Sequence, residues 1–149
     1  IKGTFLCCRA VAKELVKQGN GGKIINISSS AGVEGISRFG AYCSSKFAVR
    51  GLTQVLAKEL GEYGIQVNAI CPGMVVTERY YGIAEALAPD GVGTQEFLDE
   101  IEKQNISETP LGRVATTDDV AKIAAFLASS ESDFHTGMSI MVDGGKNMK

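Results

Sequence analysis

Three short runs of β-branched and apolar residues, separated by segments of helical periodicity, most constrain how this chain can fold. The runs cover residues 23–27 (KIINI), 65–71 (IQVNAIC) and 139–142 (SIMV). Their composition, length and turn-forming neighbours are typical of buried β-strands. Strands that alternate with helices join through right-handed crossovers into a parallel sheet with helices on both faces. We therefore predict an α/β fold.

The segments between the runs predict three principal helices. Residues 4–17 place apolar side chains on one side and charged ones on the other, which indicates an amphipathic helix. Residues 41–62 are apolar on several sides, which is typical of a well-buried helix. Thr116 and Thr117 precede a third helix at 118–128, whose first turn carries two acidic residues that the helix dipole favours.

The stretch from 75 to 110 is less regular. It contains a Pro-Asp-Gly turn at 89–91 and one short amphipathic helix at 94–103. Such an insertion between core elements either covers a binding site or is a surface loop with no role in binding. If it is a cover, Tyr80 and Tyr81 are its candidate pocket residues.

Length and composition are those of one globular domain. The chain has 149 residues, of which 44% are hydrophobic and 21% are charged. A net charge of −2 with both signs interspersed argues against a nucleic-acid-binding surface or a membrane-surface helix. No apolar run approaches the roughly 20 residues that span a bilayer, and no cleavable signal pattern opens the sequence. We expect a cytoplasmic protein.

The cysteines and the single histidine do not form a metal-binding pattern. Cys7, Cys8, Cys43 and Cys71 show neither CxxC spacing nor a cluster with histidine, so we predict no metal site and interpret them as buried, reduced thiols. His135 lies in a loop that leads into the last predicted strand. We interpret it as a structural residue rather than a catalytic one.

Residues capable of chemistry gather in one stretch, Gly22–Lys46. The first predicted strand ends in three serines at 28–30, and Tyr42 and Lys46 open the next helix four residues apart, on one face. A tyrosine is a weak acid with a pKa of about 10, and a nearby cation favours its ionised form. Ser29 could donate a hydrogen bond to a substrate oxygen beside the phenol. This set suits proton transfer to or from an oxygen, whereas no serine-histidine pair for hydrolysis is present.

Five motifs together resemble the short-chain dehydrogenase/reductase family. They are the strand GKIINISS, the segment Tyr42-Cys43-Ser44-Ser45-Lys46, the strand IQVNAICPG with Thr77 beyond it, LGR followed by a T-x-x-D-V-A helix, and TG-x-x-x-x-VDGG. The resemblance covers essentially the whole chain and implies the C-terminal portion of a Rossmann-like, doubly wound parallel sheet. Within the family, YCSSKFAVRGLTQ is most similar to bacterial butanediol (acetoin) and polyol dehydrogenases.

The resemblance implies a role for each matching residue. Tyr42 would be the catalytic acid/base, Ser29 would orient the substrate oxygen, and Lys46 would promote ionisation of Tyr42 and bind the nicotinamide ribose. Ser28 and Ser30 compete for the serine role, but the thirteen residues from Ser29 to Tyr42 match the family's usual spacing. The implied cofactor-binding residues are Tyr42, Lys46, Pro72, Gly73, Val75 and Thr77, and the candidate substrate-binding residues are Ser29, Tyr42 and Tyr80.

Several elements of the family have no counterpart in these residues. They are the Gly-rich phosphate loop, the residue that selects between NAD and NADP, and the N-N-A-G segment; the family's catalytic asparagine would fall immediately before Ile1. Three predicted strands are also fewer than the about six of a doubly wound sheet. We therefore expect residues 1–149 to be the C-terminal part of a single dinucleotide-binding domain, with a substrate lobe at 75–110, that binds cofactor poorly alone.

The implied activity is hydride transfer between a secondary alcohol or ketone, such as a small diol, hydroxyketone or polyol, and NAD or NADP, with NAD favoured. One alternative is reduction of a 3-oxoacyl thioester, and another is a non-catalytic assembly module of the same fold. The partners implied are a small-molecule substrate and further copies of the chain, in a dimer or tetramer that packs through the helices at about 4–17 and 41–62.

Overall fold

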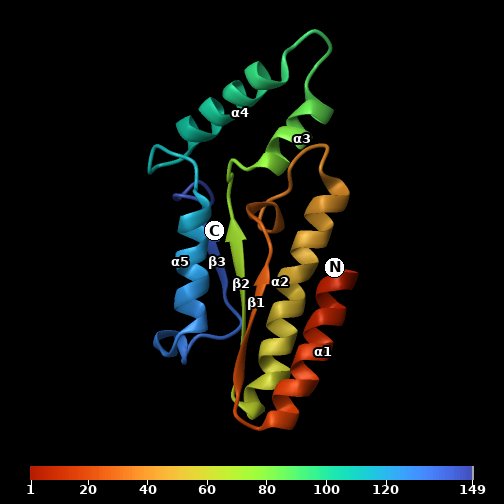
Figure 1. Ribbon diagram of the computed structural model, residues 1–149, viewed down its shortest axis with the longest axis vertical. Coiled ribbons are helices and arrows are strands. Elements are labelled where there is room, and N and C mark those ends of the chain that lie inside the picture. The colour runs from red at the N-terminus through yellow and green to blue at the C-terminus, as the bar shows by residue number, and fades with distance from the viewer. Residues whose placement is uncertain (149) are drawn as a thin grey trace.

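The computed structural model describes residues 1–148, apart from the side chain of Arg79. Eight helices and strands make up its main elements (Figure 1). In chain order they are α1 (Lys2–Gln18), β1 (Gly22–Ile27), α2 (Gly40–Leu60), β2 (Ile65–Pro72), α3 (Glu78–Leu87), α4 (Thr94–Glu108), α5 (Thr117–Ala128) and β3 (Ser139–Val142). Short 3-10 turns lie at Ser30–Gly32, Gly61–Tyr63 and Ser130–Ser132.

The three described strands form one parallel sheet in the order β1-β2-β3. Gly22 pairs with Ile65 and Ile27 with Ile70, while Ala69 of β2 pairs with Ser139 of β3. β2 is the central strand, and residues 67–71 are buried without interruption, as expected for a strand covered on both faces. The predicted α/β fold with a parallel sheet is confirmed.

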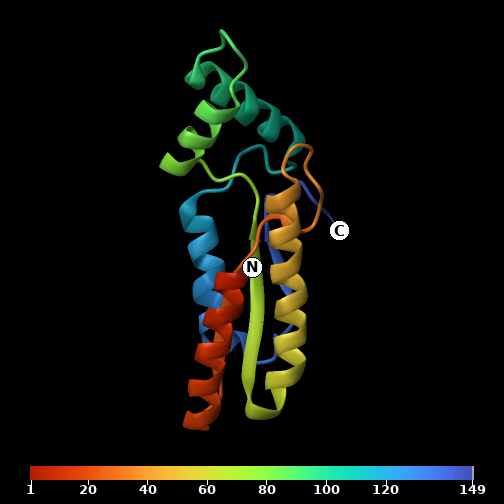
Figure 2. The same ribbon diagram turned by 90° about the vertical axis from the view of Figure 1, so that its right-hand side faces the viewer.

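Helices cover both faces of the sheet (Figures 1 and 2). α1 and α2 pack over the face that carries Ile24 and Asn26, where the Asn26 amide donates to Thr53 Oγ1 of α2 (3.0 Å) and accepts from the Cys8 thiol of α1 (3.2 Å). The apolar core between them contains Cys8, Ala12, Ile24, Ala57, Leu60, Ile65 and Val67. α5 lies over the opposite face.

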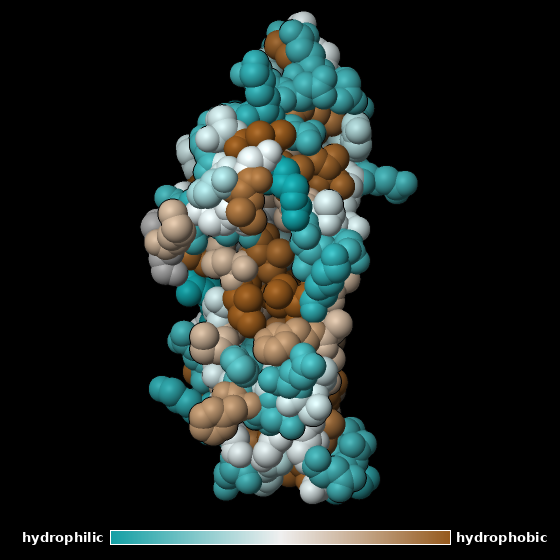
Figure 3. Space-filling model, turned by 90° about the vertical axis from the view of Figure 1, so that its left-hand side faces the viewer, coloured by the Kyte–Doolittle hydropathy of each residue, from teal (hydrophilic) through white to brown (hydrophobic). Residues whose placement is uncertain are grey.

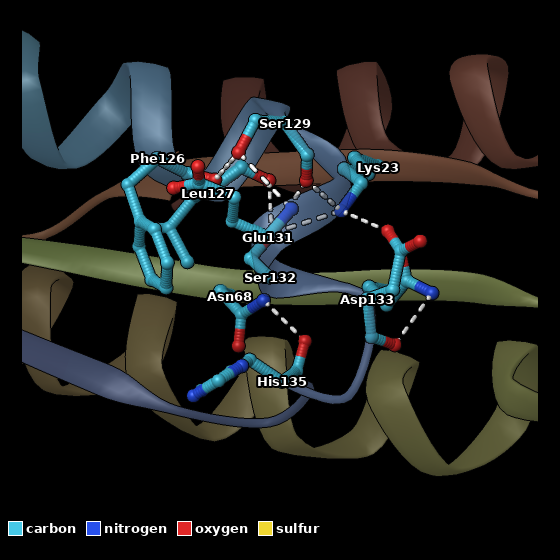
Figure 4. Close-up of polar contacts among 10 residues, drawn as sticks. Lys23, Asn68, Phe126, Leu127, Ser129, Glu131, Ser132, Asp133 and His135 are labelled. Carbon is cyan, nitrogen blue, oxygen red and sulfur yellow. Dashed lines mark hydrogen bonds and ion pairs between the residues drawn. The ribbon is translucent and has the colours of Figure 1, made fainter.

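Polar contacts attach the loop between α5 and β3 to strands β1 and β2 (Figure 4). Lys23 of β1 donates to Ser129 O (2.6 Å) and pairs with Asp133 (2.8 Å), and Asn68 of β2 donates to His135 O (2.8 Å). The His135 ring meets Phe126 edge-on at 5.6 Å between centroids. His135 therefore packs at the end of the sheet away from the polar strand ends, and it is not among the residues that line the cleft described below.

The irregular stretch 75–110 is more helical than predicted. α3 was not anticipated, because Gly82 lies in its middle and a glycine costs a helix interior about 1 kcal/mol relative to alanine. α4 runs five residues beyond the predicted end at 103, where Gln104 and Asn105 make side-chain bonds within the helix. The two helices pack together as a lobe beyond the carboxyl ends of the strands (Figures 1 and 2).

Two expectations about burial are wrong. α2 is buried on one side only, at Cys43, Val49, Thr53, Ala57 and Leu60, and Phe47 (43%) and Val55 (50%) are exposed because none of the described elements packs on their side. Cys7 is exposed whereas Cys8, Cys43 and Cys71 are buried, since one residue turns a helix by about 100°. None of the four is in a disulfide.

The surface around α5 also carries apolar side chains. They gather in the middle of the face on which α5 lies, with polar residues above and below them (Figure 3). None of the helices in residues 1–148 is long and apolar enough to cross a membrane.

Candidate active site

A cleft of about 1200 Å³ opens between the carboxyl ends of the strands and the α3–α4 lobe. Ligands of parallel α/β sheets bind beyond this edge, because loops from neighbouring strands converge there. Every residue predicted to bind cofactor or substrate lines this one cleft: Ser29, Tyr42, Lys46, Pro72, Gly73, Val75, Thr77 and Tyr80. Residues that are up to 51 positions apart in the sequence are thus brought together by the fold.

The three serines after β1 have different surroundings. Ser28 is buried, and its hydroxyl donates to the Lys46 carbonyl oxygen at 2.8 Å. Ser29 is only partly buried, and its Oγ accepts from the Ala31 N–H at 3.1 Å. Because Oγ is the acceptor in that bond, the bond does not use the Ser29 hydroxyl hydrogen. All three serines line the cleft, but only the Ser28 hydroxyl joins the strand to α2.

The turn that follows Ser29 is held against α2. A side chain at Gly32 would place its Cβ 2.8 Å from the Lys46 carbonyl group and 2.6 Å from Ser28 Oγ, so only glycine permits this approach. Arg50 NH1 donates to Gly32 O at 2.7 Å. Sequence reasoning did not identify Arg50, although it lies one turn beyond Lys46 on the same face of the helix as Tyr42.

Tyr42 and Lys46 lie one above the other at the start of α2. The Lys46 ammonium is 5.7 Å from the centroid of the Tyr42 ring and donates to Ile27 O at 3.0 Å. An ammonium carries three donors, so that single bond leaves others for a ligand. Tyr42 is 40% exposed toward the cleft, and its ring meets Phe39 edge-on. The site therefore presents a phenol, a fixed positive charge beside it and a serine hydroxyl.

The chain from Pro72 to Thr77 forms one wall of the cleft. Gly73 N donates to Val142 O (3.0 Å), and Ala115 N donates to Met74 O (3.0 Å), next to a β-bridge between Val75 and Ala115. A Cβ on Gly73 would lie 2.8 Å from Asp143 Cβ, so the glycine permits close packing on the last strand. These contacts hold an extended backbone along the cleft, directly after β2.

The lobe supplies an apolar wall opposite the strand ends. Tyr80 lines the cleft, where burial and then the nearby charge of Glu102 raise the pKa of its hydroxyl. Tyr81 is 45% exposed and does not line the cleft, so its predicted place in the pocket is wrong: it is the next residue along α3 and points to another side. Further lobe residues of the wall are Ile83, Leu87, Phe97 and Ile101.

Charged residues at the rim were also missed by sequence reasoning. Arg38, the only described non-glycine residue with a positive φ (70°), and Lys146 both line the cleft. Lys146 is paired with Glu108 (2.7 Å). No signal in the sequence marked either residue, because their place depends on how loops and the last strand pack. No group of three or more histidine, cysteine, aspartate or glutamate residues capable of holding a metal occurs in the described part of the chain.

The residues present suit a nicotinamide cofactor by their chemistry. Lys46 retains donors for ribose hydroxyls, and the backbone from Pro72 to Thr77 borders a space large enough for a nicotinamide ring and a small substrate. The polar groups that would contact the reacting oxygen, Ser29 and Tyr42, lie in the same space. The arrangement can therefore bind a carbonyl or hydroxyl oxygen and exchange a proton with it.

Comparison with known proteins gives consistent matches along the chain. The sequence model of a family described as enoyl-(acyl carrier protein) reductase matches residues 1–147. A short-chain dehydrogenase/reductase of Armillaria gallica is 44% identical over 97% of this chain and 53% of its own length. A diacetyl reductase [(S)-acetoin forming] of Staphylococcus aureus is 42% identical over 100% of this chain and 57% of its own. The chain thus spans about half the length of the curated relatives it matches.

Solved structures agree in fold. Sorbitol-6-phosphate 2-dehydrogenase of Erwinia amylovora matches with a TM-score of 0.88 at 33% identity, over 99% of this chain and 57% of that one. Acetoin dehydrogenase of Salmonella typhimurium matches with a TM-score of 0.78 at 33% identity, over 98% and 51%. A gluconate 5-dehydrogenase of Burkholderia cenocepacia in complex with NADP and tartrate matches with a TM-score of 0.82 at 34% identity, over 98% and 52%.

Proposed function

Because this chain belongs to the short-chain dehydrogenase/reductase family, we propose that the protein containing it transfers a hydride between NAD or NADP and a secondary alcohol or ketone. The observation that carries the proposal is the convergence of Ser29, Tyr42 and Lys46 on one cleft. Those three groups suit a reaction in which a carbon–hydrogen bond and an oxygen–hydrogen bond of one alcohol are broken together.

In this proposal each of the three side chains has one task. Ser29 donates its hydroxyl hydrogen to the substrate oxygen and holds it beside Tyr42. Tyr42 accepts the hydroxyl proton when an alcohol is oxidised and returns it when a ketone is reduced. Lys46 places its positive charge beside the Tyr42 ring and binds ribose hydroxyls with its remaining donors. The cofactor supplies or accepts the hydride.

The other lining residues position the two ligands. We assign the nicotinamide to the wall formed by Pro72, Gly73, Val75 and Thr77, and the substrate to the space between Tyr42 and Tyr80. The apolar lobe wall would exclude water from the reacting atoms. A small diol, hydroxyketone or polyol fits this site, and the matched relatives include proteins named for diacetyl, acetoin and a sugar alcohol phosphate.

Replacement of Tyr42 tests the assignment. In the complete protein, Tyr42→Phe should lower kcat for acetoin oxidation by about 10²- to 10⁴-fold, because the acid/base group is lost while the ring stays. Cofactor binding, followed by nicotinamide fluorescence, should remain within a few-fold. Tyr63→Phe makes the same change in a tyrosine of similar exposure (46%) outside the cleft and should change neither quantity. Near-normal turnover by Tyr42→Phe would refute the proposal.

A 3-oxoacyl thioester is the second candidate substrate. The description of the matching family model, enoyl-(acyl carrier protein) reductase, shares with this candidate only the acyl-carrier-protein thioester, because an enoyl group is reduced at a carbon–carbon double bond and not at a ketone. Both substrates present a ketone to Ser29 and Tyr42, so the chemistry is shared and only the rest of the molecule differs. A panel of acetoin, sorbitol and an acetoacetyl thioester separates the candidates by kcat/KM.

We further propose that the protein acts as a homo-oligomer, a dimer or tetramer, through α1 and α2. Support comes from apolar side chains that these helices expose together, including Phe5 (48%), Leu6 (47%) and Val55 (50%). An apolar hollow between the two helices, bordered by Phe5, Val16 and Leu56, adds to this surface.

The proposed compartment is the cytoplasm, where free cysteines such as the four described here stay reduced.

A further inference from the structure

The cleft-lining side chains of α4 all fall on one face of that helix. Phe97, Ile101, Asn105 and Glu108 are spaced by four, four and three residues, which places them in one row along the helix. The last two members of the row lie at the base of the lobe, where α4 ends. Any rotation or shift at the base therefore moves the apolar members that lie over the reaction site.

Lys146 holds the base of this row. Its ammonium donates to Asn105 Oδ1 at 2.6 Å and pairs with Glu108 Oε2 at 2.7 Å, so one cation bridges two α4 side chains. The Lys146 side chain is 27% exposed and that of Glu108 is 44% exposed, so solvent reaches the pair mainly from the Glu108 side. Hydrogen bonds from Lys146 and from Gln104 hold the pKa of the Glu108 carboxyl below its usual range.

The C-terminal turn, residues 143–147, is a fixed support for Lys146. Asp143 directly follows β3, is buried, and accepts from Gly145 N (3.1 Å) and from both the backbone and the side-chain nitrogen of Asn147 (2.8 and 3.0 Å). The turn also contacts the chain that leaves α4: Leu111 N donates to Gly144 O (3.2 Å). Gly144 has φ 65°, and a Cβ there would meet the Thr109 methyl group at 2.6 Å.

The lobe itself is attached to the body by few contacts. Ala84 and Leu98 are buried residues of α3 and α4, which pack on each other. Figures 1 and 2 show both helices beyond the strand ends, joined to β2 by one connecting segment and to α5 by another. A lobe with its own small core and two connections moves as a unit unless something fixes its base.

We propose that Lys146 is a positioning residue that fixes the cleft-lining face of α4 over the reaction site, by joining the last turn of α4 to the C-terminal turn. It acts through Asn105 and Glu108 and not on the reacting atoms. The proposal deepens the proposed function, and only its kinetic test rests on that function.

Hydrogen exchange of the complete protein tests the structural part. Lys146→Met keeps the length of the side chain and removes its charge and donors. Amide exchange in residues 94–108 should become at least about threefold faster, while exchange in β2 stays unchanged. The matched control is Lys122→Met, which removes an ion pair with Asp118 on α5, away from the cleft, and should leave α4 unchanged. Glu108→Gln breaks the same ion pair by changing the α4 residue instead of Lys146, and serves if the Lys146 variant does not fold.

Steady-state kinetics test the positioning role. KM for the ketone substrate should rise about 3- to 10-fold in Lys146→Met with kcat within about twofold, because binding is weakened while Ser29 and Tyr42 stay in place. Lys146→Arg retains a cation and donors and should restore most of the KM. Unchanged exchange in 94–108, or equally faster exchange in β2, would overturn the proposal whatever the enzyme's activity. Failure of the proposed function would instead appear as near-normal turnover of Tyr42→Phe. That result would leave the effect of Lys146→Met on exchange in α4 as expected.

Discussion

At the scale of single residues, the order of serines after β1 shows how one side-chain type can serve two purposes. Ser28 faces the same side of the sheet as Ile24 and Asn26, and its hydroxyl meets the Lys46 carbonyl oxygen of α2. Ser29 points to the opposite side because side chains alternate along an extended chain. The alternation separates a hydroxyl that joins strand and helix from one that is available to a ligand.

This separation predicts different consequences for two alanine substitutions. Ser29→Ala should lower kcat about 10²-fold or more, because the substrate oxygen loses a donor, and should leave thermal stability nearly unchanged. Ser28→Ala should lower the free energy of unfolding by about 0.5–1.5 kcal/mol through loss of a buried hydrogen bond, and kcat should fall by less than about threefold. Activity assays and urea unfolding of both variants in the complete protein measure these effects. If kcat fell more in Ser28→Ala than in Ser29→Ala, the role of orienting the substrate oxygen would belong to Ser28 and not to Ser29.

The sequence alone favoured Ser29 over its two neighbours for the substrate-binding role, but it could not predict the different contacts that the serines make. The thirteen residues between Ser29 and Tyr42 favoured Ser29 through resemblance to a family. The bond from Ser28 to Lys46, and that from Arg50 to Gly32, depend on where α2 crosses the sheet, which no local pattern records. The predicted roles of Ser29, Tyr42 and Lys46 remain proposals, although the structure brings all three residues to one cleft.

At the scale of elements, helix ends that carry caps were predictable, and those that depend on distant partners were not. Thr116 begins α5 as expected, and forms a reciprocal capping box with Asp119. The last turns of α4 bind Lys146, which lies 41 residues beyond Asn105 in the sequence. α3 has no side-chain cap, and its tyrosines and Gly82 give it a weak helical pattern.

The cap of α5 predicts a pH-dependent contribution to stability. Asp119 accepts from both terminal nitrogens of Arg113 (2.6 and 3.0 Å) and from Thr116 N (2.8 Å). Its guanidinium partner, and then the Thr116 bonds, hold the pKa of the Asp119 carboxyl well below its usual range. A carboxyl with a lowered folded-state pKa stabilises the fold above its ordinary pKa of about 4, and the contribution is lost as the pH falls toward the lowered value.

Asp119→Asn should therefore lower the Tm at pH 7 by about 2–4 °C, and the difference from wild type should shrink as the pH falls below about 4. Calorimetry at pH 7, 5 and 3 measures both parts. Asp118→Asn removes the neighbouring carboxylate, which makes only an exposed ion pair with Lys122, and should have a smaller effect at every pH. An Asp119→Asn deficit that stays constant down to pH 3 would contradict the charge-based explanation.

At the scale of the whole molecule, the parallel sheet and the two helical layers follow from the alternation of strands and helices, and were predicted from sequence. What the alternation could not predict is which side of α2 this chain leaves exposed. Phe47 and Val55 lie on one side of α2, and the apolar residues Phe5 and Val11 are exposed on the neighbouring α1. Apolar residues at helical spacing indicate a buried face, but not whether the burying surface is in the same chain.

An oligomer through α1 and α2 is expected to depend on those residues. Val55→Lys places a charge, which is costly to bury without a partner, in the middle of the exposed face of α2. We expect the dissociation constant of the assembly to rise at least about 10-fold, which corresponds to about 1.4 kcal/mol. Analytical ultracentrifugation of the complete protein between micromolar and nanomolar concentrations should show a shift to smaller species.

Val92→Lys makes the same chemical change in the loop between α3 and α4, where Val92 is 37% exposed, and should leave the distribution as in wild type. Equal dissociation of both variants would point to a general effect of added charge, and unchanged assembly of Val55→Lys would exclude α2 from the interface.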